Sequence, residues 1–377
     1  MGKASLAAVI LVLVALGCSP RYRLDPERMA TPSAWPYPRR DIAATGSIAS
    51  EEFSGQLNLI WLQKSNDKPA GPLTIYHGAL VYPGTKKKVK FYNLESGERL
   101  GILKVKGVAE TGIIMSDSIA FCGLRPRRNR LYGIDLLNRR RLWQAPIKDV
   151  APGSIIVNNR LLMSSGDGRL VAYNLDGLAE VWEFRTGHKC AAPASSGHGR
   201  VYQPDDRGVV HVLSPEDGSE LYKVELSSPL MSAVAVGELV YAATIDGKVH
   251  ALAPEDGEII WQVQLAGPIW NSPAVGNDRL YAAHSGGGIV ALDAATGREV
   301  WNYRIDEVVK ASPTLIGRFV VAGTMTGQVV TLDADTGRLL ASHRLKGAIG
   351  FPPVSDGRHV YVATESGRIA CFGGHRE

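Results

Sequence analysis

The residues best suited to intermolecular contact are two clusters of basic side chains. They are Lys86, Lys87, Lys88 and Lys90 in the first cluster, and Arg125, Arg127, Arg128 and Arg130 in the second. Both clusters occupy the same hairpin position in two successive units of the repeat described below, so we expect them to emerge on one face as a cationic patch. Such a patch attracts an acidic protein surface or anionic headgroups. The alternative is a solvated surface that only aids solubility.

Other residues that could carry chemistry do not group into a site. Cys122, Cys190 and Cys371 are far apart and no CxxC motif occurs, so we predict buried thiols and neither a metal nor a redox site. The histidines lack a metal-binding spacing such as HExxH. Acidic residues such as Asp293 lie in or beside turns, where their side chains can bond the local backbone. We therefore predict no catalytic residues, no metal and no cofactor.

The composition bounds the class of protein. The chain has 377 residues, of which 45% are hydrophobic, and its net charge is +5. Glycine (41) and proline (21) are abundant, which favours many short strands joined by turns. The basic excess is mild and the basic clusters lack interleaved aromatic residues, so we predict no binding to nucleic acid.

The N-terminus is predicted to be a targeting segment. The apolar stretch Leu6–Leu16 follows Lys3 and is shorter than the ~20 residues that span a bilayer, so residues 1–17 are interpreted as a signal peptide. The junction Ala15-Leu16-Gly17-Cys18 resembles the lipobox of bacterial lipoproteins, although that pattern prefers Leu where Ala15 stands. The resemblance implies lipid attachment at Cys18 and, with Ser19 next, the periplasmic face of an outer membrane. The alternative is an ordinary cleaved signal peptide.

Residues 18–56 carry five prolines and show no period. We predict a Pro-rich tether between the membrane and the folded domain. Trp35 within it either docks on the domain or is exposed.

An internal repeat of about 40 residues fills the remainder of the chain. Glycines 39 or 40 residues apart mark it, namely Gly168, Gly208, Gly247, Gly287, Gly327 and Gly367. One unit contains four short apolar segments separated by turns, namely Asn271–Val275, Tyr281–Ala283, Ile289–Leu292 and Glu299–Trp301. Four antiparallel strands in such a unit are typical of a β-propeller blade.

Counting units predicts an all-β domain over residues 57–373, an eight-bladed β-propeller of four-stranded antiparallel blades. Lys87 and Asn129 take the place of the turn glycine in the first two blades. The last blade, from about Gly350, lacks its outer strand when the chain ends, and Leu57–Gln63 matches that strand. An N-terminal strand should therefore complete the last blade and close the ring.

Tryptophans recur on the predicted outer strands, at Trp61, Trp143, Trp182, Trp261 and Trp301. We expect them to pack one blade against the next. Trp270 lies off this register, at the start of an inner strand, and is a further candidate for partner contact.

The pattern A-L-D-x-x-T-G-x-x-x-W, complete at Ala291–Trp301, resembles the repeat of pyrroloquinoline-quinone-type propellers. Together with the lipobox, the tether and eight blades, the whole chain resembles the BamB family of outer-membrane assembly lipoproteins. The resemblance implies a non-catalytic periplasmic scaffold that holds the periplasmic repeat domains of the β-barrel insertase.

Two alternatives remain open. Quinoprotein dehydrogenases use the same repeat, but they resemble one another in a vicinal Cys-Cys pair, which this chain lacks. A propeller lipoprotein that binds another cell-envelope ligand would share the whole sequence pattern.

Overall fold

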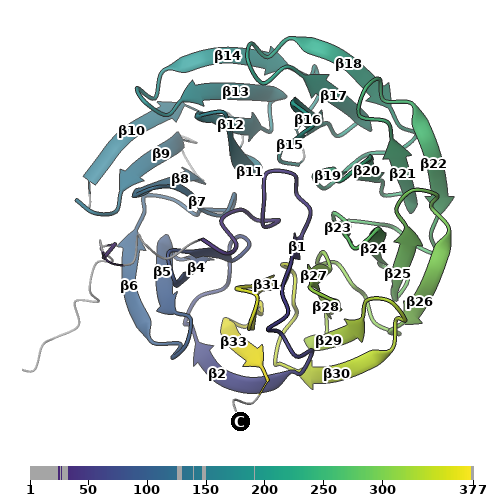
Figure 1. Cartoon of the computed structure of the whole chain (residues 1–377). Coiled ribbons are helices and arrows are strands. Elements are labelled where there is room, and N and C mark those ends of the chain that lie inside the picture. The colour runs from purple at the N-terminus through teal and green to yellow at the C-terminus, as the bar shows by residue number, and fades with distance from the viewer. Residues whose placement is uncertain are drawn as a thin grey trace, which may run out of the picture.

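The computed structural model describes residues 24–25, 27, 33–124, 130–138, 140–146, 150–190 and 192–374. These residues form eight sheets arranged in a ring, so the predicted all-β eight-bladed propeller is confirmed (Figure 1). Each sheet has its first strand near the centre of the ring and its last strand at the periphery. Among the described residues, no helix has the length and apolar character needed to cross a bilayer.

The strands of blades 1 to 4 follow one another along the chain. Blade 1 consists of β3 (Thr74–Tyr76), β4 (Ala79–Gly84), β5 (Lys88–Asn93) and β6 (Arg99–Lys104). Blade 2 consists of β7 (Ile114–Ser116), β8 (Ile119–Leu124), β9 (Arg130–Asp135) and β10 (Arg140–Pro146). Blade 3 consists of β11 (Val150–Val157), β12 (Arg160–Ser165), β13 (Arg169–Asn174) and β14 (Glu180–Arg185). Blade 4 consists of β15 (Ser195–Gly197), β16 (Arg200–Pro204), β17 (Val209–Leu213) and β18 (Glu220–Glu225).

Blades 5 to 7 repeat this order, and blade 8 departs from it. Blade 5 consists of β19 (Ala235–Val236), β20 (Val240–Ala243), β21 (Lys248–Leu252) and β22 (Ile259–Gln264). Blade 6 consists of β23 (Ala274–Gly276), β24 (Arg279–His284), β25 (Gly288–Asp293) and β26 (Glu299–Arg304). Blade 7 consists of β27 (Thr314–Ile316), β28 (Phe319–Gly323), β29 (Gln328–Asp333) and β30 (Leu339–Arg344). Blade 8 consists of β31 (Val354–Ser355), β32 (Val360–Ala363), β33 (Arg368–Gly373) and β2 (Asn58–Lys64).

The ring closes through the two ends of the domain. β2 pairs antiparallel with β33, with Trp61 opposite Cys371 and Lys64 opposite Arg368. The N-terminal strand thus supplies the outer strand that the last blade lacks, as the sequence predicts. Closure therefore gives the last blade the same four strands as the other blades.

Turn residues with positive φ set the hairpins between second and third strands. Gly208 has φ 93° and Gly327 has φ 92° at this position. Lys87 occupies the same position in blade 1 with φ 58°, so the turn keeps its conformation without glycine. Asn129, predicted for blade 2, lies outside the described residues.

The hydrophobic core consists of the faces of adjacent blades. In blades 6 and 7, Tyr281, Ala291 and Trp301 pack with Val320 and Leu332 in one buried cluster. The outer strand contributes because its register with the third strand shifts between Ala291 and Leu292, and this bulge recurs in several other blades.

Candidate functional site

The tryptophans of the outer strands hold neighbouring blades together, as predicted. Each indole N–H donates to a turn carbonyl of the following blade, with N···O distances between 2.8 and 3.2 Å, in the pairs Trp61–Leu94, Trp182–Pro215, Trp261–Ala294 and Trp301–Ala334. Trp143 is half-buried and meets the Tyr173 ring of blade 3 edge-on at 4.8 Å between centroids. These side chains therefore pack and hydrogen-bond one blade to the next.

Residues 33–50, which we call the N-terminal strap, lie inside the ring of inner strands (Figure 1). The strap begins at blade 1, where Trp35 and Ile75 exchange backbone hydrogen bonds of 3.3 and 2.8 Å. The Trp35 side chain is fully buried. Of the two placements that the sequence leaves open for Trp35, the structure shows docking on the domain.

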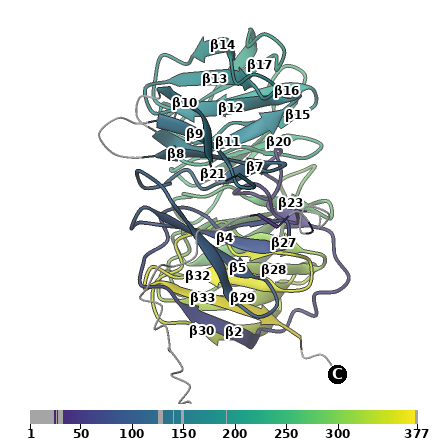
Figure 2. The same cartoon turned by 90° about the vertical axis from the view of Figure 1, so that its left-hand side faces the viewer.

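The strap then follows the inner strands of four successive blades. Backbone amides of blades 4 to 7 donate to its carbonyls over 2.7 to 3.0 Å, in the pairs Ser196–Ile42, Val236–Ala43, Val275–Thr45 and Leu315–Gly46. β1 (Ser47–Ile48) is the part of the strap that pairs in parallel with β27. The segment that joins β1 to β2 runs along one face of the disc, which Figure 2 shows edge-on.

Arg39 fixes the strap in the channel. Its guanidinium donates to the carbonyls of Pro273 at 2.7 Å and Pro313 at 3.1 Å, at the inner edges of blades 6 and 7. Burial lowers the pKa of Arg39 to about 10, although the nearby Asp41 carboxylate opposes this shift. The inner edges of blades 6 and 7 are therefore contacted by a cation of the chain itself.

The interface between blades 1 and 2 breaks the tryptophan pattern. Gly101 of β6 has the register position that Trp301 has in β26. The carbonyl of Leu136, which corresponds to that of Ala294, accepts instead the backbone N–H of Leu24 at 3.2 Å. The Leu24 side chain is 1% exposed and belongs to the core cluster of these blades. The N-terminal segment thus replaces the missing indole.

The predicted cationic patch is only partly present among the described residues. Lys86 and Lys87 are exposed and Lys88 is half-buried, in the hairpin between β4 and β5. Arg130 is half-buried at the start of β9. Arg125, Arg127 and Arg128, as well as the lipid attachment residue Cys18, lie outside the described residues.

Lys90 does not meet the expectation that it faces solvent. It is 6% exposed, and its ammonium donates to Ser65 Oγ at 2.5 Å and lies 3.7 Å from Asp67 Oδ2. Burial lowers its pKa, and Asp67 opposes this shift. The second strand of blade 1 and the connection from blade 8 enclose this side chain, and the pair could not be seen in the sequence because it joins residues of two blades.

Two further lysines, which the sequence reasoning missed, extend the surface at the hairpin. Lys104 lies beside the hairpin because it is the register partner of Lys88. Lys68 lies there too, because its carbonyl accepts the backbone N–H of Thr85 at 3.0 Å. Both lysine side chains are exposed. We call Lys68, Lys86, Lys87, Lys88 and Lys104 the blade 1 lysine patch. The pairing of β5 with β6 is the sequence signal that could have found Lys104.

Trp270 lies in the connection between blades 5 and 6 and is 42% exposed. The Lys310 ammonium lies 6.0 Å from the centre of its ring. Because connections between blades emerge on the same face as the hairpins between second and third strands, Trp270 shares a face with the blade 1 lysine patch. It belongs to the other side of the ring, so the structure does not bring these candidates together (Figure 1).

The remaining chemistry-bearing groups are structural. Cys122, Cys190 and Cys371 are free and buried. The Asp293 carboxylate accepts the Thr296 amide at 2.9 Å and its hydroxyl at 2.8 Å, which lowers the pKa of Asp293 and stabilises the turn. Within the part of the chain that the structure describes, no three His, Cys, Asp or Glu residues group as metal ligands.

The buried thiols should not react in the folded protein. Burial raises the pKa of Cys122 to about 12 and of Cys190 to about 11, and also raises that of Cys371, so all three stay protonated at pH 8. We expect no labelling of these thiols by a disulfide reagent at pH 8. After unfolding, three thiols should react if Cys18 is acylated and four if it is free, because the chain has 4 cysteines. Rapid native labelling of any of the three, located by peptide mass spectrometry, would contradict this expectation.

Comparison with solved structures supports the fold. BamB from Moraxella catarrhalis is 16% identical, with a TM-score of 0.73 over 84% of this chain and 100% of that chain. The computationally designed Ika8 protein is 15% identical, with a TM-score of 0.72 over 84% and 100%. The quinohemoprotein alcohol dehydrogenase ADHIIG from Pseudomonas putida HK5 is 12% identical, with a TM-score of 0.76 over 94% and 83%. At these identities the likeness concerns the fold alone.

The sequence comparisons are more specific. No curated protein matches the chain in sequence. The family described as outer membrane protein assembly factor BamB matches residues 166–307 and, in an overlapping match, residues 206–376. These matches cover more than half of the chain and include the repeat units that define blades 4 to 8. The chain therefore belongs to the BamB family of outer membrane protein assembly factors.

Proposed function

We propose that this protein is a non-catalytic, lipid-anchored scaffold on the periplasmic face of the outer membrane, where it takes part in the assembly and insertion of β-barrel proteins. Its partner would be the periplasmic repeat domains of the β-barrel insertase, and its anchor would be acyl chains on Cys18. The family match over most of the propeller is the observation that carries this proposal.

The channel geometry also favours a scaffold. Quinoprotein dehydrogenases share the fold, and an enzyme of that class would place its cofactor at the centre of the ring. Here Arg39 and the N-terminal strap occupy the inner edges of blades 4 to 7. The sequence has no adjacent cysteines, and the described residues offer no set of metal ligands. These features favour the scaffold over a quinoprotein enzyme.

A different envelope complex is the second candidate partner, since the blade 1 lysine patch would attract any acidic protein surface. The two candidate partners are distinguished by purifying the protein from its own envelope in mild detergent and identifying the co-purifying proteins by mass spectrometry. Recovery of the barrel insertase would support the proposal. Recovery of another complex, or a quinone absorbance in the eluate, would overturn it.

The blade 1 lysine patch should contribute to partner binding. Reversing Lys86 and Lys88 to glutamate should weaken the affinity for the co-purified partner on the order of tenfold, mainly through slower association, because charges at an interface rim steer encounter. Lys87 is left in place because its positive φ is part of the turn. Surface plasmon resonance at two salt concentrations measures both the affinity and its salt dependence.

The matched control reverses Arg207 and Lys248, which hold the same hairpin positions in blades 4 and 5. The control carries the same change in net charge, so equal weakening by both double variants would show a general charge effect and no role for the patch. Trp270→Ala tests the second predicted contact independently, since this residue lies on the other side of the ring.

A further inference from the structure

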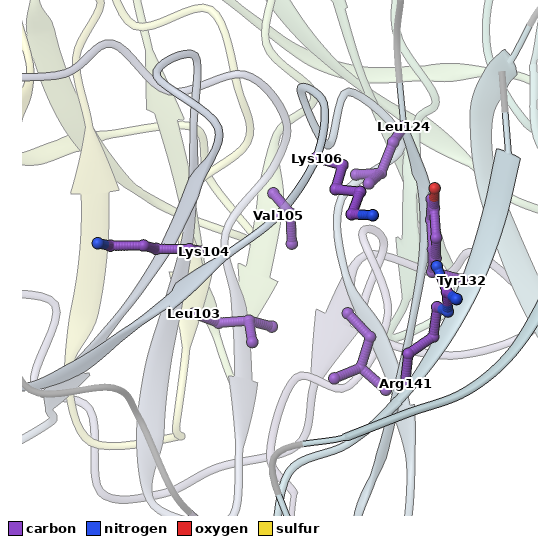
Figure 3. Close-up of a pocket in the computed structure, with 8 residues that line it drawn as sticks. Leu103, Lys104, Val105, Lys106, Leu124, Tyr132 and Arg141 are labelled. Carbon is purple, nitrogen blue, oxygen red and sulfur yellow. The ribbon is translucent and has the colours of Figure 1, made fainter. Parts of the chain in front are cut away.

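A groove opens between blades 1 and 2, at the interface where the tryptophan pattern is broken. Its volume is about 370 Å³, which falls within the range of ~300–1,000 Å³ that is typical of ligand sites. Its apolar lining comes from both blades, namely Leu103, Val105, Leu124, Tyr132 and Ile134. Figure 3 shows the side chains from β6 and the following residues facing those of blade 2.

Cations border this apolar surface. Lys104, Lys106 and Arg141 line the groove, and none of its lining residues is acidic. In Figure 3, Lys104 extends away from the other side chains, whereas Lys106 and Arg141 direct their nitrogens to the side where Tyr132 lies. The Arg141 guanidinium is 5.8 Å from the centre of the Tyr132 ring. An apolar ligand with negative charge at its edges would match this lining.

Other cavities of the molecule have a different character. One cavity of about 420 Å³ contains Glu238, Asp278 and Asp293, and another of about 590 Å³ contains Glu51. Both lie beside the N-terminal segment and include its residues. The groove between blades 1 and 2 therefore differs from both in combining cations with apolar side chains and lacking acids.

The groove follows from the repeat. Gly101 provides no indole to pack between these blades, and Leu24 instead contacts the turn that contains Leu136. The side chains further along β6 and after it, Leu103 and Val105, are half-buried and pack at the edge of the core cluster of these two blades. Without an indole at Gly101, Leu103 and Val105 thus keep apolar surface that lines the groove.

We propose that this groove binds an extended, acidic segment of a protein partner, with apolar side chains at alternate positions. β6 is the last strand of its sheet, so its outer edge offers backbone groups to an added strand. Alternate side chains of such a strand would enter the groove, and carboxylates beside them would face Lys106 and Arg141. The inference rests on the scaffold function and names the part of the molecule that receives the partner.

The test uses the full chain purified in mild detergent and fluorescein-labelled peptides. The first peptide alternates acidic residues with leucine and phenylalanine. The second replaces the acidic residues with lysine, and the third replaces the apolar residues with serine. We expect only the first to bind, by fluorescence anisotropy, and its binding to weaken as salt rises. Bound peptide should slow hydrogen exchange of the Lys104 and Lys106 amides, because the Val105 amide already donates to the Lys87 carbonyl and alternate amides point to the outer edge.

Two variants of the groove should remove binding by different routes. Lys106→Glu with Arg141→Glu reverses the charges, and Val105→Trp fills the apolar space. Each variant should weaken peptide binding at least about tenfold. A tenfold change corresponds to a loss of only about 1.4 kcal/mol of binding free energy, which reversing two charges or filling the apolar space should exceed. The control, Lys346→Glu with Arg338→Glu, changes two exposed cations of blade 7 and should bind as the parent does. Lys346 has the position after β30 that Lys106 has after β6.

The outcomes separate this inference from the scaffold function. Equal binding of all three peptides, or no effect of both groove variants, would overturn the groove. Binding of phosphatidylglycerol vesicles instead of the acidic peptide, lost on charge reversal, would assign the groove to a lipid surface and also overturn it. Co-purification of the insertase with the intact and the Lys106→Glu, Arg141→Glu proteins alike would leave the scaffold standing without the groove. Peptide binding without any envelope partner would instead overturn the scaffold.

Discussion

Replacing Trp35 with alanine should lower the free energy of unfolding by about 3–5 kcal/mol, the usual cost of removing a large buried aromatic side chain. Trp35 is 0% exposed and packs in a cluster with Ile75, Tyr82 and Tyr361, from blades 1 and 8. Its indole nitrogen has no hydrogen-bond partner among the described residues, so the loss would come from packing alone. Urea unfolding followed by circular dichroism measures the effect.

Trp270→Ala is the control for this substitution, because it removes the same side chain from a site that is 42% exposed. It should change stability by no more than about 0.5 kcal/mol. Similar stability of the two variants would show that the strap does not contribute to the folded state. A much larger effect of Trp35→Ala would show that residues before the propeller are part of its core.

Gly297→Ala should destabilise the protein by about 2–4 kcal/mol, from the positive φ of this position and from overpacking. Gly297 has φ +72°, and a Cβ there would lie 2.6 Å from Cε3 of Trp261 in the preceding blade. The aromatic ring cannot withdraw without leaving its bond to the Ala294 carbonyl. Loss of the interface between blades 5 and 6 should appear as a lower urea midpoint and as altered tryptophan fluorescence.

Gly177→Ala is the matched change in the same turn of blade 3. A Cβ at Gly177 meets nothing within 4 Å, and the positive φ of that turn belongs to Leu178 instead. This variant should be neutral, or slightly more stable because the unfolded chain loses freedom. If both glycine variants proved equally unstable, the contact between tryptophan and glycine would not explain the interface.

The repeat allowed most of the propeller to be predicted from the sequence. Glycine spacing located the hairpins, the position of Lys87 identified a turn without glycine, and the match of Leu57–Gln63 to an outer strand predicted the closure. Each of these features follows from the repeat: the turns recur at its interval of about 40 residues, and Leu57–Gln63 supplies the strand that the last unit lacks. The tryptophan contacts could be predicted for the same reason.

The strap could not be predicted because its contacts leave no pattern. Ile42, Ala43 and Gly46 use their backbone carbonyls, which every residue possesses. The sequence predicts Lys90 at the surface because it belongs to the basic cluster Lys86–Lys90 of a hairpin, whereas its partner Asp67 comes from the connection that follows β2. The empty tryptophan position at Gly101 is visible in the repeat, but the residue that replaces the indole belongs to a segment without any period.

The contact of Leu24 with the Leu136 carbonyl also limits how far the propeller could move from a membrane. Leu24 is the sixth residue after Cys18, and six fully extended residue steps reach only ~22 Å. A lipid on Cys18, as we propose, would then be joined to blades 1 and 2 by a short segment. These blades would stay close to the membrane surface. The disc would tumble little, and its partners would meet it in a restricted range of orientations.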